Sequence, residues 1–134
     1  MSDERLEKLR RYFENDRFVS HSDIEIAEVG DDYAVTAADV LPCHLNAEGA
    51  VQGGMIYTLA DFAFAVLANS LHPTTVTQCA HVSYIRAART ARITATARET
   101  ERAGHNCIVE VIVRDDEGRT VCVCNFNGFV SSKE

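Results

Sequence analysis

The fold of this 134-residue chain is decided by residues 53–69, which read GGMIYTLADFAFAVLAN. The stretch is apolar nearly all round, and a helix with that pattern is buried inside a domain rather than laid on its surface. It is shorter than a membrane-spanning helix usually is, and it contains both an aspartate and an asparagine. We therefore predict one long central helix that the rest of the chain must cover.

Four segments with the character of β-strands follow this helix, at about 74–86, 90–102, 105–115 and 119–130. Turn-forming residues separate them. Upstream, apolar residues alternate with polar ones on both sides of Gly30-Asp31-Asp32, which predicts a hairpin from Ile24 to about Val35. A run of strands after a helix favours an antiparallel sheet, so we predict an α+β fold in which one sheet curls around the central helix.

The N-terminal region is predicted to be helical. Leu6, Leu9 and Phe13 recur at helical spacing between residues 3 and about 14. This helix belongs to an N-terminal helical segment, 1–20, of a single domain that spans residues 1–134. The chain opens with charged residues where the apolar part of a signal peptide would stand, so we expect a cytoplasmic location.

Composition and charge argue against several classes of function. The net charge of -7 argues against broad nucleic-acid binding, which needs a basic surface. Five of the 13 basic residues nevertheless lie between Arg86 and Arg102, and this local charge is compatible with a phosphate-bearing ligand. The five cysteines form no CxxC pair, so we expect reduced thiols rather than zinc ligands. We predict no metal site, no membrane partner and no separate cofactor.

Asp61 is the only charged residue between Glu48 and Arg86, and it stands in the middle of the predicted helix. An unpaired buried carboxylate is costly, so its presence requires an explanation. One explanation is structural, because the carboxylate could pair with an arginine or cap a neighbouring element. The other is chemical, because partial burial raises the pKa of a carboxyl group and suits a general base.

Gly53 and Gly54 stand where the helix is expected to begin. Without a Cβ they expose backbone N–H groups at the positive end of the helix dipole, which could hold an anion or polarise a carbonyl group. A plain corner between loop and helix would also explain them. Asp61 follows Gly53 by eight residues, about 12 Å along one helix. Cooperation between them on one small carbonyl group would therefore require a homodimer with sites at the interface.

Residues 44–54 (HLNAEGAVQGG), with Leu59-Ala60-Asp61 and Asn69-Ser70 downstream, resemble the hotdog thioesterases of the phenylacetic acid degradation (PaaI-like) family. The resemblance covers about residues 22–131 and implies a hotdog fold, in which an antiparallel sheet wraps one long helix. It implies hydrolysis of an acyl-CoA by a homodimer or, more usually, a tetramer, with coenzyme A as part of the substrate. The implied catalytic residues are Asp61 as nucleophile or general base, Gly53 as backbone donor to the carbonyl oxygen, Asn46 as the residue that places water or substrate, and Thr77 as an assisting hydroxyl.

The same resemblance implies residues that contact the substrate. Gln52, Gly54 and His44 would lie near the thioester, although the role favoured for His44 is a structural hydrogen bond in its loop. The family usually has a histidine at the position of Gln52, and glutamine cannot move a proton near neutral pH. Arg86 and Arg89 would bind the phosphates of coenzyme A, with a solvated basic edge as the alternative.

The acyl pocket is expected to be lined by Met55, Leu59 and Phe62, each of which is also an ordinary core residue. Aryl-acetyl, hydroxyaryl and medium-chain acyl groups all fit such a pocket. Two other functions stay open, namely hydration or dehydration of an acyl thioester and non-catalytic binding of acyl-CoA. Gln52 counts against hydration and dehydration, because those relatives pair a catalytic histidine with a helix acid.

Overall fold

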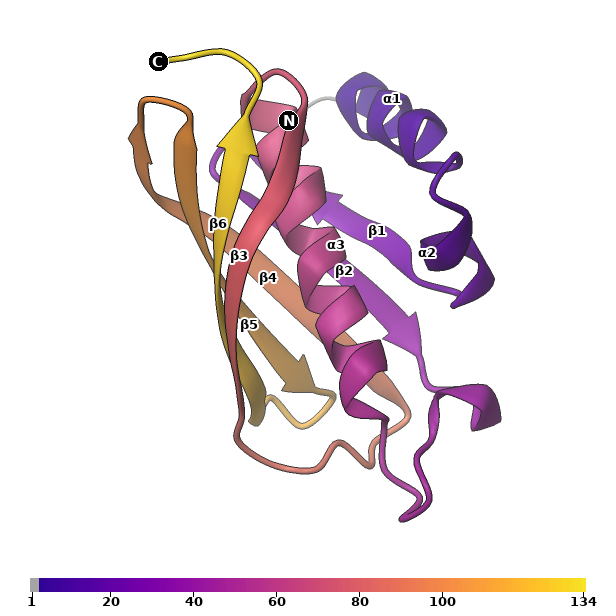
Figure 1. Ribbon diagram of the computed structural model, residues 1–134. Coiled ribbons are helices and arrows are strands. Elements are labelled where there is room, and N and C mark those ends of the chain that lie inside the picture. The colour runs from indigo at the N-terminus through magenta and orange to yellow at the C-terminus, as the bar shows by residue number, and fades with distance from the viewer. Residues whose placement is uncertain (1–2) are drawn as a thin grey trace.

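The computed structural model of the chain describes residues 3–134. Six antiparallel strands form one sheet in the order β1-β2-β4-β5-β6-β3, and the sheet curls around helix α3 (Gly53–Leu71) (Figure 1). This confirms the predicted α+β fold. The strands are β1 (Glu25–Val29), β2 (Tyr33–Asp39), β3 (Thr75–Tyr84), β4 (Arg92–Ala103), β5 (Asn106–Asp115) and β6 (Thr120–Val130).

The core lies between α3 and the concave face of the sheet. Ten of the 19 residues of α3 are buried, and β5 turns alternate residues, Cys107, Val109, Val111 and Val113, towards them. By length and composition alone α3 could cross a membrane, but the core helix of a soluble protein passes the same test. Its buried residues identify α3 as the core helix that the sequence predicts.

Two helices precede the sheet, α1 (Asp3–Phe13) and the short α2 (Arg17–His21). Helix α1 confirms the helix predicted from residue 3 to about residue 14. The sequence pattern does not predict α2 as a separate helix. Phe13 meets Phe62 of α3 edge to face, with the ring centroids 5.2 Å apart. The Asp16 carboxylate caps α2 by accepting a hydrogen bond of 3.1 Å from the Val19 N–H. Residues 1–2 of the predicted helical segment 1–20 lie outside the described residues.

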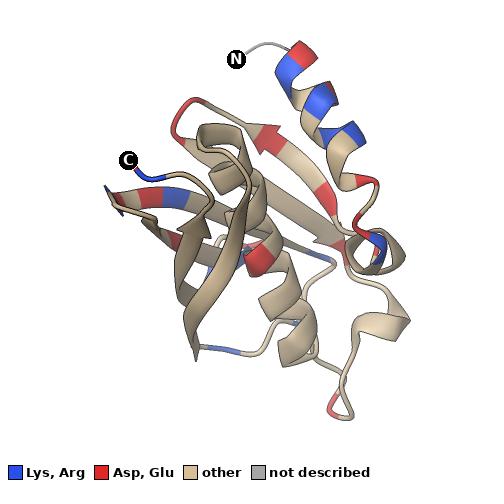
Figure 2. Ribbon diagram, turned by 45° about the horizontal axis from the view of Figure 1, so that its top comes forward, with Lys and Arg blue, Asp and Glu red and all other residues tan. Residues whose placement is uncertain are grey.

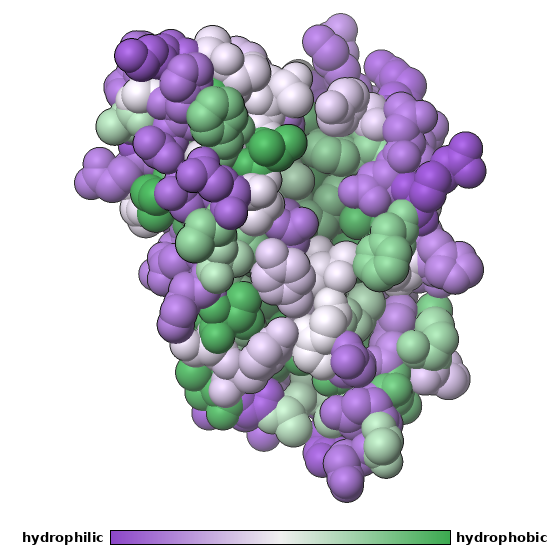
Figure 3. Space-filling model, in the orientation of Figure 1, coloured by the Kyte–Doolittle hydropathy of each residue, from purple (hydrophilic) through white to green (hydrophobic). Residues whose placement is uncertain are grey.

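Strand β3 forms one edge of the sheet, where it pairs only with β6. Val76, Tyr84 and Ile85, in or next to this strand, are exposed apolar or aromatic side chains. Weakly polar and apolar side chains run down the middle of the face seen in Figure 3. A long edge strand with apolar neighbours is a surface on which another strand can pair.

All five cysteines are free thiols. Cys107, Cys122 and Cys124 are buried as small apolar side chains, as predicted. Cys43 and Cys79 are exposed and contribute nothing to the core.

Candidate active site

Asp61 lies in the middle of α3, on the stripe of the helix that the sheet leaves uncovered. Its carboxylate is partly buried, and Oδ1 accepts a hydrogen bond of 2.6 Å from the hydroxyl of Thr77 on β3. Burial raises the pKa of Asp61, the Thr77 hydrogen bond opposes that rise, and the negative charge of Asp16 adds to it. No cation from residues 3–134 forms an ion pair with this carboxylate. The structural alternative, an arginine pair, is therefore not what holds Asp61.

A β-bulge interrupts β3 directly after Thr77. The register with β6 shifts between Thr77 and Cys79, and bulges commonly re-aim a side chain near a functional site. Thr77 is paired with Gly128, where an added Cβ would lie 2.5 Å from the ring of Phe64. The glycine thus lets α3 and β6 approach closely beside the Asp61–Thr77 pair.

The N-terminus of α3 has one backbone donor without a partner. The Gly54 N–H donates to the side chain of Gln52, which caps the helix, so this N–H already has an acceptor within the protein. The predicted substrate contact of Gly54 stays a prediction. The Gly53 N–H has no acceptor among residues 3–134. The Tyr84 hydroxyl donates a hydrogen bond of 2.8 Å to the Gly53 carbonyl oxygen, and burial raises the pKa of Tyr84, which keeps that hydroxyl protonated.

Asn46 shapes the loop before α3. Its side-chain oxygen accepts hydrogen bonds of 2.9 Å and 3.1 Å from the N–H groups of Glu48 and Ala50. The amide oxygen is therefore used within the loop, and only the NH2 group remains to act on water or substrate as predicted.

His44 is buried, and both of its ring nitrogens are used within the protein. Nδ1 accepts a hydrogen bond from the Leu41 N–H, so the neutral ring donates from Nε2 to the Ser22 carbonyl oxygen over 2.8 Å. The structural alternative therefore accounts for both ring nitrogens, and a substrate contact of His44 stays a prediction.

Arg86 and Arg89 differ in their surroundings. The Arg89 guanidinium donates a hydrogen bond of 3.0 Å to the Glu48 carbonyl oxygen, which brings it to the loop before α3. Arg86 is exposed, and its guanidinium makes no hydrogen bond or ion pair within the part of the chain that is described. Of the two arginines predicted to bind phosphate, only Arg89 is hydrogen-bonded to the loop that carries Asn46.

A cavity of about 610 Å3 opens beside the N-terminal half of α3. Met55 lines it, whereas Leu59 is fully buried and Phe62 is packed against Phe13. Leu59 and Phe62 therefore do not line this cavity, and their predicted place in an acyl pocket stays a prediction. His44, Gln52 and Gly54, which the sequence predicts to contact the substrate, also line this cavity. Phe18, Leu45 and Tyr57, which were not among the predicted site residues, complete its apolar and aromatic lining.

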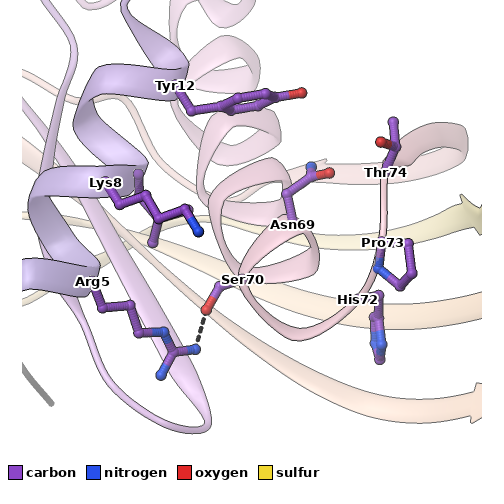
Figure 4. Close-up of a pocket in the computed structure, with 9 residues that line it drawn as sticks. Arg5, Lys8, Tyr12, Asn69, Ser70, His72, Pro73 and Thr74 are labelled. Atoms are coloured by element: carbon purple, nitrogen blue, oxygen red, sulfur yellow. Dashed lines mark hydrogen bonds between the residues drawn. The ribbon is translucent and has the colours of Figure 1, made fainter.

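A second cavity, of about 460 Å3, lies at the other end of α3, between α1 and the turn at residues 72–74 (Figure 4). Arg5, Lys8 and Tyr12 line it from α1. Several of its polar side chains are hydrogen-bonded within the protein. Arg5 donates to the Ser70 hydroxyl, and Asn69 exchanges three hydrogen bonds with neighbouring backbone groups.

Sequence reasoning missed Tyr84 and Phe18 for different reasons. Tyr84 ends a strand, and nothing in its neighbours reveals that its hydroxyl reaches the first residue of α3. Phe18 is an apolar residue in a five-residue helix, and an exposed side chain in such a helix has no periodicity to mark it.

Comparisons with known proteins show which family the chain resembles in sequence. A family model described as thioesterase superfamily matches residues 48–122. A putative esterase of Deinococcus radiodurans is 34% identical over 111 residues, which cover 81% of this chain and 74% of that protein. The acyl-coenzyme A thioesterase PaaI of Escherichia coli is 24% identical over 124 residues, 92% of this chain and 89% of that protein.

Two solved structures are similar in fold. The E. coli PaaI protein from the phenylacetic acid degradation operon aligns with a TM-score of 0.88 at 22% identity, over 96% of this chain and 94% of that chain. A hypothetical thioesterase from Streptococcus pneumoniae, solved with coenzyme A, aligns with a TM-score of 0.76 at 27% identity, over 83% of this chain and 90% of that chain. These likenesses confirm the predicted hotdog fold.

Proposed function

Because this chain belongs to the thioesterase superfamily, we propose that it hydrolyses the thioester of an acyl-CoA to a free acid and coenzyme A, with Asp61 as the catalytic carboxylate. The observation that carries the proposal is the Asp61–Thr77 pair. A carboxylate with a raised pKa, one neutral hydrogen-bond partner and no ion pair within residues 3–134 is suited to accept a proton or to attack a carbonyl carbon.

Two routes fit this carboxylate. In one, Asp61 takes a proton from a water molecule that attacks the thioester carbonyl carbon. In the other, Asp61 attacks directly, the thiolate of coenzyme A leaves, and water hydrolyses the resulting mixed anhydride. In both routes the Thr77 hydroxyl orients the carboxylate through the 2.6 Å hydrogen bond.

The carbonyl oxygen of the thioester needs a donor, and the unpartnered Gly53 N–H is suited to that role. Asp61 lies eight residues further along the same helix, about 12 Å away by helix geometry. The proposal therefore pairs Asp61 of one subunit with Gly53 of its partner. Asn46, in the loop before Gly53, would place water or substrate through its NH2 group.

A dimer formed along β3 would bring these groups together. Thr77 and Tyr84 lie near opposite ends of that edge strand, and Tyr84 is bonded to Gly53. Antiparallel pairing of two β3 strands about a two-fold axis would set Thr77 of one subunit beside Tyr84 of the other. The exposed apolar side chains next to this edge would be covered at the same time, and a tetramer would join two such dimers.

The decisive test uses two variants that damage different halves of the site. Asp61→Asn removes the carboxylate. Gly53→Pro removes only the N–H, because proline suits the first position of a helix and Gln52 has the extended conformation (φ -63, ψ 139) that precedes proline. Gly53→Ala is the matched control, since it keeps the N–H and its Cβ would lie 3.4 Å from the Tyr84 ring, an ordinary contact.

Release of free thiol from a panel of acyl-CoAs measures the reaction. We expect each variant alone to be nearly inactive and Gly53→Ala to be active. Co-expression of the two inactive variants would yield about half mixed dimers with one intact site each, and so restore about one quarter of the activity. No restoration would mean that the site lies within one subunit. A change in enoyl absorbance would indicate a hydratase. Binding of acyl-CoA with neither free thiol nor an absorbance change would indicate a non-catalytic module.

A further inference from the structure

The edge strand β3 has a second face, which points away from α3. After the bulge, Ala80 and Val82 pack against the core on the concave face of the sheet. Successive residues of a strand point to opposite faces, so the residues beside and between these two point to the convex face. They are Cys79, His81 and Ser83. His81 is exposed on that face, and its neighbour across the ladder is the exposed Asn125 of β6.

This alternation restricts how two β3 strands can pair in the proposed dimer. Residues directly opposite each other in an antiparallel pair point to the same face, so after the bulge odd-numbered residues must lie opposite odd-numbered ones. Gln78 is the extra residue of the bulge, and it shares one position along the strand with Thr77. The register that sets this position opposite the partner subunit's Tyr84 therefore sets His81 opposite the partner subunit's His81.

His81 thus lies on the two-fold axis, facing its own copy. Side chains in directly opposite positions have Cβ atoms about 4.5–5.5 Å apart. Two imidazole nitrogens bound to one Zn²⁺ ion, with Zn–N bonds of about 2 Å in tetrahedral geometry, lie about 3.4 Å apart, which rings on such neighbouring Cβ atoms can reach. Neither β3 nor β6 contains a lysine or an arginine, so no cation on these strands repels a metal ion. Along the same row of the ladder, Asn125 is followed by the carboxylate of Glu110 on β5.

We propose that the two His81 side chains of a dimer bind one divalent transition-metal ion, such as Zn²⁺, on the convex face of the sheet. The inference rests on the dimer of the proposed function. Imidazole is a preferred ligand of these ions. Cys79 lies two residues from His81, about 6.7 Å along the strand, so its thiol is too distant to share the ion and water completes the coordination.

One chain supplies a single imidazole to this site. For that reason the sequence alone predicts no metal site, and within residues 3–134 of one chain no group of three or more metal-binding side chains lies together. The ion would join the two subunits at the strand pair that brings Asp61 to the partner subunit's Gly53. Because it binds only the paired strands, it stabilises the dimer and not the separate subunit. The site lies on the face of the sheet opposite to Asp61, so the ion takes no part in hydrolysis.

Equilibrium dialysis against Zn²⁺, followed by elemental analysis, tests the site. For the wild type we expect about one zinc ion per two chains and a higher melting temperature in zinc than in EDTA. His81→Asn should lose both the bound zinc and the zinc-dependent rise in melting temperature. Cys79→Ser is the matched control on the same face of β3, and His21→Asn removes an exposed histidine outside β3. Both controls should bind zinc as the wild type does.

Three results would overturn the inference: a wild-type dimer that binds no zinc, zinc binding that persists in His81→Asn, and zinc binding that is lost in Cys79→Ser. Light scattering and thiol release separate this failure from that of the proposed function. A monomeric wild type refutes the proposed dimer and this site with it. A dimer that hydrolyses acyl-CoA without binding zinc refutes the inference alone. A dimer that binds zinc through His81 and hydrolyses no acyl-CoA refutes the proposed function and supports the site.

Discussion

The two ends of α3 differ in how two pairs of their polar groups are hydrogen-bonded. At the N-terminal half, the Gly53 N–H has no acceptor within residues 3–134, and Asp61 has one neutral partner. At the C-terminal end, Asn69 and Ser70 are hydrogen-bonded within the protein. Figure 2 shows that α1 is highly charged, whereas α3 is almost uncharged. Groups that the fold has satisfied serve the architecture, and groups that it leaves open are available to a substrate.

The largest effect on activity is expected from Asp61→Asn, which removes the carboxylate in the N-terminal half of α3. Loss of the general base or nucleophile should lower kcat by about a thousandfold. Folding raises the pKa of Asp61, so the ionised form is penalised in the folded state at every pH above the unfolded value of about 3.9. The variant should therefore melt at a higher temperature than the wild type at pH 7, and this gain should vanish as the pH falls below that value. Thermal denaturation across this pH range checks it, and a variant that is less stable at pH 7 would contradict the account of burial.

Asn69→Ala changes the C-terminal end of α3, and we expect it to lower stability and to leave activity nearly unchanged. The side chain donates to the Ala65 and Thr75 carbonyl oxygens and accepts from the Thr75 N–H, so its loss should cost about 2 kcal/mol of unfolding free energy. Activity per folded molecule should stay within about twofold of the wild type. Urea denaturation and thiol release measure the two quantities. A large loss of kcat in a folded variant would show that the C-terminal end takes part in the chemistry.

Thr77→Val sharpens the comparison by removing the only hydrogen-bond partner of Asp61 within the described chain. The Thr77 hydrogen bond lowers the pKa of Asp61, so its removal should move that pKa further up. Because the ionised carboxylate is the active form, the acid limb of the kcat/KM profile should shift to higher pH, and kcat should fall about tenfold. Thr77→Ser keeps the hydroxyl and should keep the wild-type profile. A shift of the limb to lower pH would exclude Asp61 as the group that titrates.

The parts of the structure that the sequence could predict are those that local patterns encode. The central helix and the four strands after it carry strong local patterns, since an apolar run, alternation and turn residues are all read within a few positions. Asp61 stands out for the same reason, because it is one charge in an apolar helix. The bulge that aligns Thr77, the hydroxyl contact of Tyr84 and the cavity wall at Phe18 depend on segments that are distant in sequence, and no local pattern encodes them. Leu59 and Phe62 do not line the cavity beside α3, and periodicity could not show this, because it does not tell which apolar residues of an all-round apolar helix face the core.

The smallest effect is expected from Tyr84→Phe, which tests whether the open end is held in position from outside α3. The lost hydroxyl donates to the Gly53 carbonyl oxygen, so the first peptide groups of the helix would lose one restraint. We expect a threefold or so fall in kcat with little change in KM, and a loss of about 1 kcal/mol in unfolding free energy. Tyr33→Phe is the matched control, because it removes a tyrosine hydroxyl bonded to Glu28 between β1 and β2, at the edge of the sheet opposite β3. Equal kcat in the two variants would show that Tyr84 only supports the fold. A loss of kcat in Tyr84→Phe alone would mean that β3 positions the start of α3, so that the Gly53 N–H can donate to the carbonyl oxygen of the thioester.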